Sequence, residues 1–202
     1  MSKLYFRYGV MGCGKTTLLL QVIYNYYEKG MKTILIKPSI DTKASDSVSS
    51  RIGLEKKVYV LLKAHDRIMD INFNEVKAIV VDEAQFLTPA QVDELYYVTK
   101  FLEIPVICYG IRCDFSMNTF PGSARLLAIA DQLEEIKTIC KCGVKATQNV
   151  RYKDGVPVFS GNQVEIDDGE TYTYGNLCGK CYLKLKKEGE KDGRKANKRR
   201  WS

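Results

Sequence analysis

The sequence has no long hydrophobic run, and it has only one histidine. None of its apolar stretches approaches the roughly 18 residues that a membrane-spanning helix needs, so we expect no membrane association. The first residues, MSKLYFRYG, lead directly into a strand-like run without the features of a signal peptide, which predicts a cytoplasmic protein. The single histidine, His65, lies in the polar stretch KAHDR, and we assign it no role.

Most of the chain also lacks a surplus of charge of one sign. The net charge of +7 comes mainly from residues 183–202, which hold nine Lys or Arg and three Asp or Glu and leave 22 basic and 21 acidic side chains elsewhere. A nearly neutral body does not favour specific binding to nucleic acid. We expect the basic, glycine-containing residues 186–202 to form a disordered tail.

The sequence does contain an alternation of strand-like and helix-like segments through residue 139. Apolar runs typical of strands cover residues 4–8, 32–37, 57–62, 77–82, 105–111 and 133–139. Helical patterns cover residues 15–29, 88–102 and 122–130, and Thr88 with Pro89 is a typical helix start. This order predicts an α/β core with a mostly parallel sheet over residues 1–139. Residues 140–185 have a different character and predict a second, smaller domain.

The stretch GVMGCGKT matches the phosphate-loop pattern and lies between a predicted strand and a predicted helix. Glycines allow main-chain N–H groups to surround phosphate oxygens, and the helix N-terminus adds a positive potential. We expect Lys15 to reach the β- and γ-phosphates and Thr16 to bind Mg²⁺. The predicted nucleotide-binding loop consists of Gly9, Val10, Met11, Gly12, Cys13, Gly14, Lys15 and Thr16.

Two adjacent acids, Asp82 and Glu83, follow the apolar run in IVVDEAQF. Consecutive strand residues point to opposite faces, so two acids at one strand end indicate different roles. We expect Asp82 to support Mg²⁺ and Glu83 to polarise a nucleophile beside the γ-phosphate. The second part of the predicted nucleotide site consists of Asp82, Glu83, Ala84 and Gln85. The nucleophile is either water or a hydroxyl group of a substrate.

A nucleic-acid-dependent ATPase is the alternative function, because a DEAQ-like tetrapeptide also occurs in helicases. Helicases need two α/β lobes to move a strand, and this chain has room for one. Residues 143–177 carry more acidic than basic side chains, which repel a phosphate backbone. The sequence therefore favours a phosphotransferase that acts on a small hydroxyl compound.

Four of the seven cysteines form two closely spaced pairs, Cys140 with Cys142 and Cys178 with Cys181. Two such pairs suit a tetrahedral structural zinc site, although the first pair is one residue closer than is usual. A zinc ion held by all four thiolates would fix both ends of the long segment 143–177.

Taken in order, the motifs resemble the thymidine kinase family, in the type shared by the human cytosolic enzyme and many bacteria. The motifs are GVMGCGKT, KPSID with VSSRIGL, VVDEAQF, YGIRCDF with FPGS, ICKCG and LCGKCY, and the resemblance covers about residues 3–183. It implies a RecA-like P-loop core with a zinc-bearing lasso domain at 140–185. The implied reaction transfers the γ-phosphate of ATP to the 5′-hydroxyl of thymidine and gives dTMP for DNA synthesis.

The resemblance also implies roles for individual residues. Glu83 is the general base, and Asp82 helps to hold Mg²⁺. The residues that bind the thymine base or shape its pocket are Met11, Phe86, Ile111, Phe115, Phe120 and Tyr174. Main-chain groups between Val164 and Tyr174 recognise thymine, in a segment where Asp168-Gly169 replaces the two glycines found in many members. A homotetramer and inhibition by thymidine triphosphate are implied as well.

Overall fold

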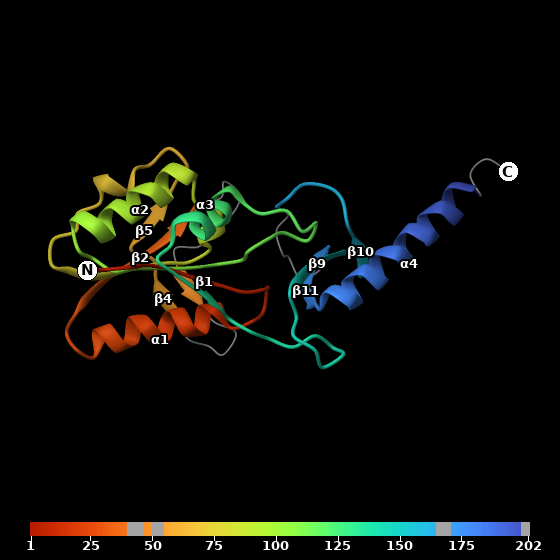
Figure 1. Ribbon diagram of the computed structural model, residues 1–202, viewed down its shortest axis with the longest axis horizontal. Helices are drawn as coiled ribbons and strands as arrows, with labels where there is room; N and C mark the ends of the chain where they lie inside the picture. Colours follow the sequence, from red (N-terminus) through yellow and green to blue (C-terminus); the bar gives the residue numbers. More distant parts are fainter. Residues whose placement is uncertain (40–46, 50–54, 165–170, 199–202) are drawn as a thin grey trace. The chain divides into compact units, whose positions relative to one another are not determined.

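The computed structural model describes residues 1–39, 47–49, 55–164 and 171–198 (Figure 1). The chain folds into two compact units. The first unit consists of Met1–Gly9, Gly14–Arg112 and Thr119–Ile136. The second consists of Val10–Cys13, Cys113–Asn118 and the chain from Lys137 onward. The centre of the phosphate loop thus belongs to the second unit, which the sequence did not predict.

A six-stranded sheet forms the centre of the first unit, in the order β5-β2-β6-β7-β1-β8. All of its pairings are parallel, so the predicted α/β class with a mostly parallel sheet is confirmed. The strands are β1 (Leu4–Tyr8), β2 (Lys32–Pro38), β5 (Val60–Leu62), β6 (Val76–Val81), β7 (Val106–Gly110) and β8 (Gln132–Glu135). Two further strands, β3 (Ser47–Ser49) and β4 (Glu55–Lys57), pair with each other.

Helices cover both faces of this sheet (Figure 1). Helix α1 (Lys15–Tyr27) lies on one face, and α2 (Pro89–Phe101) and α3 (Pro121–Ile129) lie on the other. The alternation of strand side chains matches this arrangement, because Ile79 and Val81 pack with the α2 and α3 side chains while Val80 packs with those of α1. A strand covered on both faces is continuously apolar, as the sequence of β6 is.

Helix α2 begins as its sequence predicts. Thr88 lies at the N-cap, Pro89 follows in the first turn, and Thr88 and Gln91 form a reciprocal capping box. Two short 3₁₀ helices complete the first unit, η1 (Ile68–Asp70) and η2 (Ala84–Phe86). The second of these follows the two acids at the end of β6.

The second unit contains a three-stranded antiparallel sheet in the order β10-β9-β11. Its strands are β9 (Gln148–Lys153), β10 (Val156–Val158) and β11 (Tyr172–Leu177). Asp154 and Gly155 join β9 to β10, both with positive φ, as a tight two-residue hairpin turn requires. Side chains such as Val150, Leu177 and Tyr182 form a separate small core.

Helix α4 (Gly179–Lys198) is the last element that the structure describes. It extends into residues 186–202, the segment that we expect to form a basic tail. The first turns are anchored because Tyr182 and Leu185 pack into the core of the second unit. The following residues are rich in Lys and Glu, which have high helix propensity, so the helix propagates from this anchor. None of the helices that the structure describes is long and apolar enough to cross a membrane.

Candidate active site

The candidate site of the first unit lies at the carboxyl edge of its parallel sheet. Gly9 follows β1, Asp82 follows β6, and Ile111 follows β7. Ligands of open parallel sheets bind outside this edge, because loops from neighbouring strands meet there. The phosphate-loop motif and the acidic pair are therefore brought to one edge by the order of the strands.

The phosphate loop, Gly9–Thr16, connects β1 to α1. The Gly9 N–H donates to the Gly110 carbonyl at 3.2 Å, and Lys15 Nζ donates to the Gly9 carbonyl at 3.3 Å. Gly14 is the N-cap of α1 with φ of 87°, a left-handed conformation that favours glycine. The Lys15 ammonium thus lies over the beginning of its own loop, at the N-terminus of a helix, where a phosphate is stabilised.

Two asparagines of the second unit hold the centre of this loop. Asn149 Oδ1 accepts from the Met11 N–H at 2.8 Å, and Asn176 Nδ2 donates to the Met11 carbonyl at 2.9 Å. Asn149 and Asn176 lie opposite each other on β9 and β11, and Asn149 also donates to the Cys113 carbonyl at 2.7 Å. Sequence reasoning missed both residues, and the only available signal was a polar side chain within each strand.

Asp82 is buried at the end of β6, with 5% of its surface exposed. Burial and, to a lesser extent, the neighbouring Glu83 charge raise the pKa of its carboxyl group to about 7, although the Lys37 and Lys15 charges oppose the shift. A cation beside Asp82 would favour the charged form. A carboxylate together with the Thr16 hydroxyl offers the oxygen ligands that Mg²⁺ prefers, so these residues fit the predicted metal.

Glu83 occupies a different environment from its neighbour. It has φ of 50°, a left-handed conformation that is uncommon for residues other than glycine, and it is partly exposed. Its carboxylate accepts a hydrogen bond from the Gln85 side chain. The chain turns abruptly after β6, so the two acids of one strand end receive different surroundings, as the sequence suggested.

Three predicted base-pocket residues lie in the first unit. The rings of Phe86 and Phe120 meet edge to face, with centroids 5.4 Å apart. Ile111 is 8% exposed, and its carbonyl accepts from the Ser123 hydroxyl at 2.6 Å. Phe120 is the N-cap residue of α3. Phe86 follows β6, the strand that also leads to the acidic pair, and Ile111 directly follows the neighbouring strand β7.

The other three predicted pocket residues, Met11, Phe115 and Tyr174, belong to the second unit. The Arg151 guanidinium lies 3.7 Å from the centroid of the Phe115 ring, and the Tyr182 hydroxyl donates to the Phe115 carbonyl at 2.6 Å. Tyr174 lies on β11 opposite Arg151 on β9. Arg151 is only 2% exposed, and sequence reasoning did not identify it as a partner of Phe115.

Asp114 fixes the turn that carries Phe115. One carboxylate oxygen accepts from the Ser116 and Asn118 N–H groups at 2.8 and 2.9 Å, and the other accepts from Gln163 Nε2 at 3.0 Å. Asp114 thereby satisfies main-chain donors of a short loop with its side chain, as Asx turns do. Its role in shaping the loop was not anticipated from the sequence.

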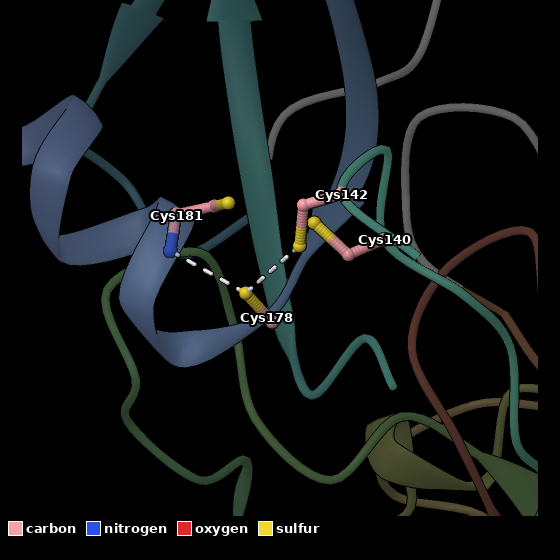
Figure 2. A group of neighbouring side chains, drawn as sticks. All are labelled: Cys140, Cys142, Cys178 and Cys181. Atoms are coloured by element: carbon pink, nitrogen blue, oxygen red, sulfur yellow. Dashed lines mark hydrogen bonds between the residues drawn. The ribbon is translucent and has the colours of Figure 1, made fainter. Parts of the chain in front are cut away.

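The four paired cysteines meet in the second unit (Figure 2). Their sulfur atoms all lie within 4.8 Å of one another, and the Sγ atoms of Cys142 and Cys178 are 3.6 Å apart. Zn–S bonds of about 2.3 Å in a tetrahedron place sulfur atoms roughly 3.8 Å apart, so the cluster is compatible with zinc. Hydrogen bonds from the main chain at Cys142 and Cys178 lower the pKa of Cys140 to about 6, which favours the ligand form. The segment between residues 164 and 174, expected to recognise thymine, falls largely outside the described residues.

A phosphate loop between β1 and α1, a buried acid at the end of β6 and a parallel sheet define a nucleotide-binding protein of the P-loop class. The sequence model of the thymidine kinase family matches residues 2–182, and this chain belongs to that family. It is 47% identical over 179 residues to a thymidine kinase of Rhodopirellula baltica, covering 85% of this chain and 84% of that protein. It is 45% identical over 186 residues to a thymidine kinase of Ruegeria pomeroyi, covering 89% of this chain and 93% of that protein. It is 41% identical over 199 residues to a thymidine kinase of Photorhabdus laumondii, covering 95% of this chain and 98% of that protein.

Proposed function

We propose that this chain is an ATP:thymidine 5′-phosphotransferase that produces dTMP for DNA synthesis through nucleotide salvage. Family membership supports the substrate and the donor. The observation that carries the chemistry is the pair of adjacent acids, of which Asp82 is buried while Glu83 is partly exposed and turned away by a left-handed backbone. The buried Asp82 is suited to bind a cation, and the partly exposed Glu83 is suited to accept a proton from the substrate.

Each group of site residues has a separate role in the proposed reaction. Main-chain N–H groups of Gly9–Thr16 surround the phosphates of ATP, and Lys15 neutralises charge on the β- and γ-phosphates. Thr16 and Asp82 would hold Mg²⁺, which would offset the negative charge that develops on the phosphates. Glu83 accepts the proton of the 5′-hydroxyl as its oxygen attacks the γ-phosphorus, and the bond to the β-phosphate oxygen breaks to release ADP.

Recognition of thymidine is assigned to Met11, Phe86, Ile111, Phe115, Phe120 and Tyr174. Phe86 with Phe120 and Phe115 with Arg151 are packed into fixed orientations, which supports their use as rigid apolar contacts for a planar base. Side-chain rigidity of this kind lowers the entropy cost of binding.

We assign a structural role to zinc, bound by Cys140, Cys142, Cys178 and Cys181. The cluster joins the segment before β9 to the start of α4, so it links the two ends of the lasso domain at 140–185. Four protein ligands leave no open coordination position for chemistry.

The proposed assembly is a cytoplasmic homotetramer. Support comes from apolar side chains exposed on two helices of the first unit, including Tyr24 and Tyr27 on α1 and Phe101 on α2, which is 69% exposed. The Tyr97 and Phe101 rings stack with centroids 4.3 Å apart and together form an apolar surface. Light scattering at working concentration should give four times the mass of one chain, and a monomer mass would refute the assembly.

The decisive experiment for the function is an assay of ADP release with thymidine, deoxycytidine or water as the only acceptor. We expect rapid ADP release that depends on thymidine, with dTMP formed in equal amount. Thymidine triphosphate should inhibit, because its phosphates and base would compete with those of donor and acceptor. If DNA stimulated ATP hydrolysis while thymidine did not, the alternative ATPase function would replace this one.

A further inference from the structure

Gln85 is a buried polar side chain whose amide makes two hydrogen bonds. It lies in η2 and is only 2% exposed. Its Nε2 donates to Glu83 Oε2 at 2.5 Å, and its Oε1 accepts from the Ile111 N–H at 3.1 Å. One amide thus connects the proposed general base to the chain that follows β7.

The orientation of this amide is determined by its partners. The Ile111 main chain offers an N–H, which only the amide oxygen can accept. The amide nitrogen therefore faces the Glu83 carboxylate, which accepts hydrogen bonds. If the amide were reversed, its NH₂ group would meet the Ile111 N–H and its oxygen would meet the carboxylate, which would leave buried polar groups without hydrogen-bond partners.

Gly110 provides the space that the amide occupies. A Cβ atom at this position would lie 2.8 Å from Gln85 Oε1 and 3.1 Å from the Gln85 main-chain nitrogen. Real Cβ atoms essentially never show a contact as short as 2.8 Å, so a side chain at residue 110 would displace the amide. The absence of a side chain at Gly110, the last residue of β7, therefore leaves room for the Gln85 amide, although the two residues are far apart in the sequence.

Glu83 depends on this support because its own backbone does not fix its side chain. A glutamate has three rotatable side-chain bonds, and a base must be held within a small distance of the proton that it removes. With Oε2 bound to Gln85, Oε1 is left as the oxygen that accepts a proton.

We propose that Gln85 is a positioning residue that holds Glu83 in its catalytic orientation, rather than a residue that contacts ATP. The inference rests on the proposed role of Glu83 as the general base. It changes the expectation from the sequence, in which the whole tetrapeptide of residues 82–85 was assigned to the nucleotide.

Two substitutions test the two hydrogen bonds of the Gln85 amide. Gln85→Met keeps the length of the side chain and removes both hydrogen bonds. Gln85→Glu keeps an oxygen acceptor for the Ile111 N–H but places a second carboxylate against Glu83. If holding Glu83 is what matters, both variants lower kcat by about 10–100-fold and change KM for ATP and thymidine by less than about threefold.

Gln91→Met is the matched control. Gln91 is also a buried glutamine, 3% exposed, but it caps α2 and donates to the Lys63 and Asp66 carbonyls. Gln91→Met should lower thermal stability and leave kcat within about twofold of the value of the unchanged protein. Gly110→Ala supplies an independent test, because it should lower kcat as Gln85→Met does while leaving Gln85 in the sequence.

The double variant Glu83→Gln/Gln85→Met distinguishes failure of this inference from failure of the proposed function. If Gln85 acts through Glu83, then Gln85→Met lowers kcat by less than about twofold once Glu83 is replaced. Near-normal kcat in folded Gln85→Met, or a raised KM for ATP with kcat unchanged, would overturn the inference while the proposed base stands. Near-normal kcat in Glu83→Gln alone would overturn the proposed base itself, and the inference with it.

Discussion

At the residue scale, the proposed chemistry depends on the different surroundings of two neighbouring side chains. Asp82 and Glu83 are adjacent, yet the first continues the buried strand β6 and the second turns away with φ of 50°. Burial raises the pKa of Asp82, which suits a group whose charge is balanced by a cation. The partial exposure of Glu83 leaves it accessible to a substrate.

Replacing the two acids should therefore impair the enzyme in different ways. Glu83→Gln keeps the size of the side chain but cannot accept the proton, so kcat should fall by about 10²–10⁴-fold with KM nearly unchanged. Asp82→Asn should instead raise the Mg²⁺ concentration needed for half-maximal activity. Steady-state assays over a range of Mg²⁺ concentrations measure both effects. If excess Mg²⁺ restored Glu83→Gln but not Asp82→Asn, the two roles would be exchanged.

The hydrogen bond between Asn149 and the Met11 N–H gives a second prediction at this scale. Asn149→Ala should loosen the centre of the phosphate loop and raise KM for ATP by about 2–10-fold, the equivalent of one hydrogen bond. Asn72→Ala, in an exposed turn, is the control and should leave KM unchanged. An unaltered KM for ATP in Asn149→Ala would show that the loop keeps its conformation without this bond.

At the scale of single elements, helix ends are determined by local chemistry. Helix α2 begins with a complete capping box, in which the Thr88 side chain accepts from the Gln91 N–H and the Gln91 side chain accepts from the Thr88 N–H. Helix α4 is instead determined by packing at its start, where Tyr182 contacts Phe159 edge to face. This difference explains why the sequence predicted the first helix but not the extent of the second.

The capping box predicts the effect of a conservative surface change. Thr88→Ala should lower the free energy of unfolding by about 1 kcal/mol, because it leaves the Gln91 N–H without its partner. The corresponding fall in Tm is roughly 2–4 °C, measured by thermal denaturation. Activity at 25 °C should be retained, since α2 contributes none of the proposed catalytic groups. A Tm equal to that of the unchanged protein would contradict the capping role.

Truncation tests which part of α4 is needed. A chain that ends at Lys187 keeps Cys181, Tyr182 and Leu185, which anchor the helix in the core of the second unit. It loses Gly189, whose Cα lies close enough to Phe159 for an added Cβ to be 3.4 Å from the ring. We expect full kcat and zinc content, with a small decrease in Tm. A large loss of activity would show that the distal half of α4 has a function of its own.

At the scale of the whole molecule, each of the two units must be stabilised by its own core. The second unit has few buried apolar side chains, and a domain of this size commonly needs a metal or a disulfide for stability. The four clustered thiols are compatible with zinc, which in the proposed function supplies that support in place of a disulfide. Loss of the metal should therefore unfold this unit first.

Elemental analysis should find about one zinc per chain, and Cys178→Ser should abolish it and lower Tm. Cys108→Ala is the control, because Cys108 is buried in the core of the first unit, outside the cluster. It should retain zinc. Because Asn149 and Asn176 of the second unit also hold Met11, loss of zinc should raise KM for ATP. Finding no metal in the unchanged protein would contradict the proposed site.

The sequence by itself determined the features that depend on residues close together along the chain. The phosphate loop, the strand before Asp82, the capped start of α2 and the cysteine pairs each follow from local patterns of size, polarity and turn chemistry. The parallel class of the sheet also followed, because strands and helices alternate. For the same reason, the motifs were sufficient to indicate the thymidine kinase family.

Only the tertiary structure decided the contacts between distant segments. Nothing near Gln85 in the sequence indicates that its amide meets the Ile111 N–H, or that Gly110 leaves the space for it. The same holds for Met11, whose main chain is bound by Asn149 and Asn176, which lie 138 and 165 positions further along the chain. Such contacts depend on the order and register of strands, which are set by the packing of the whole core rather than by any local pattern.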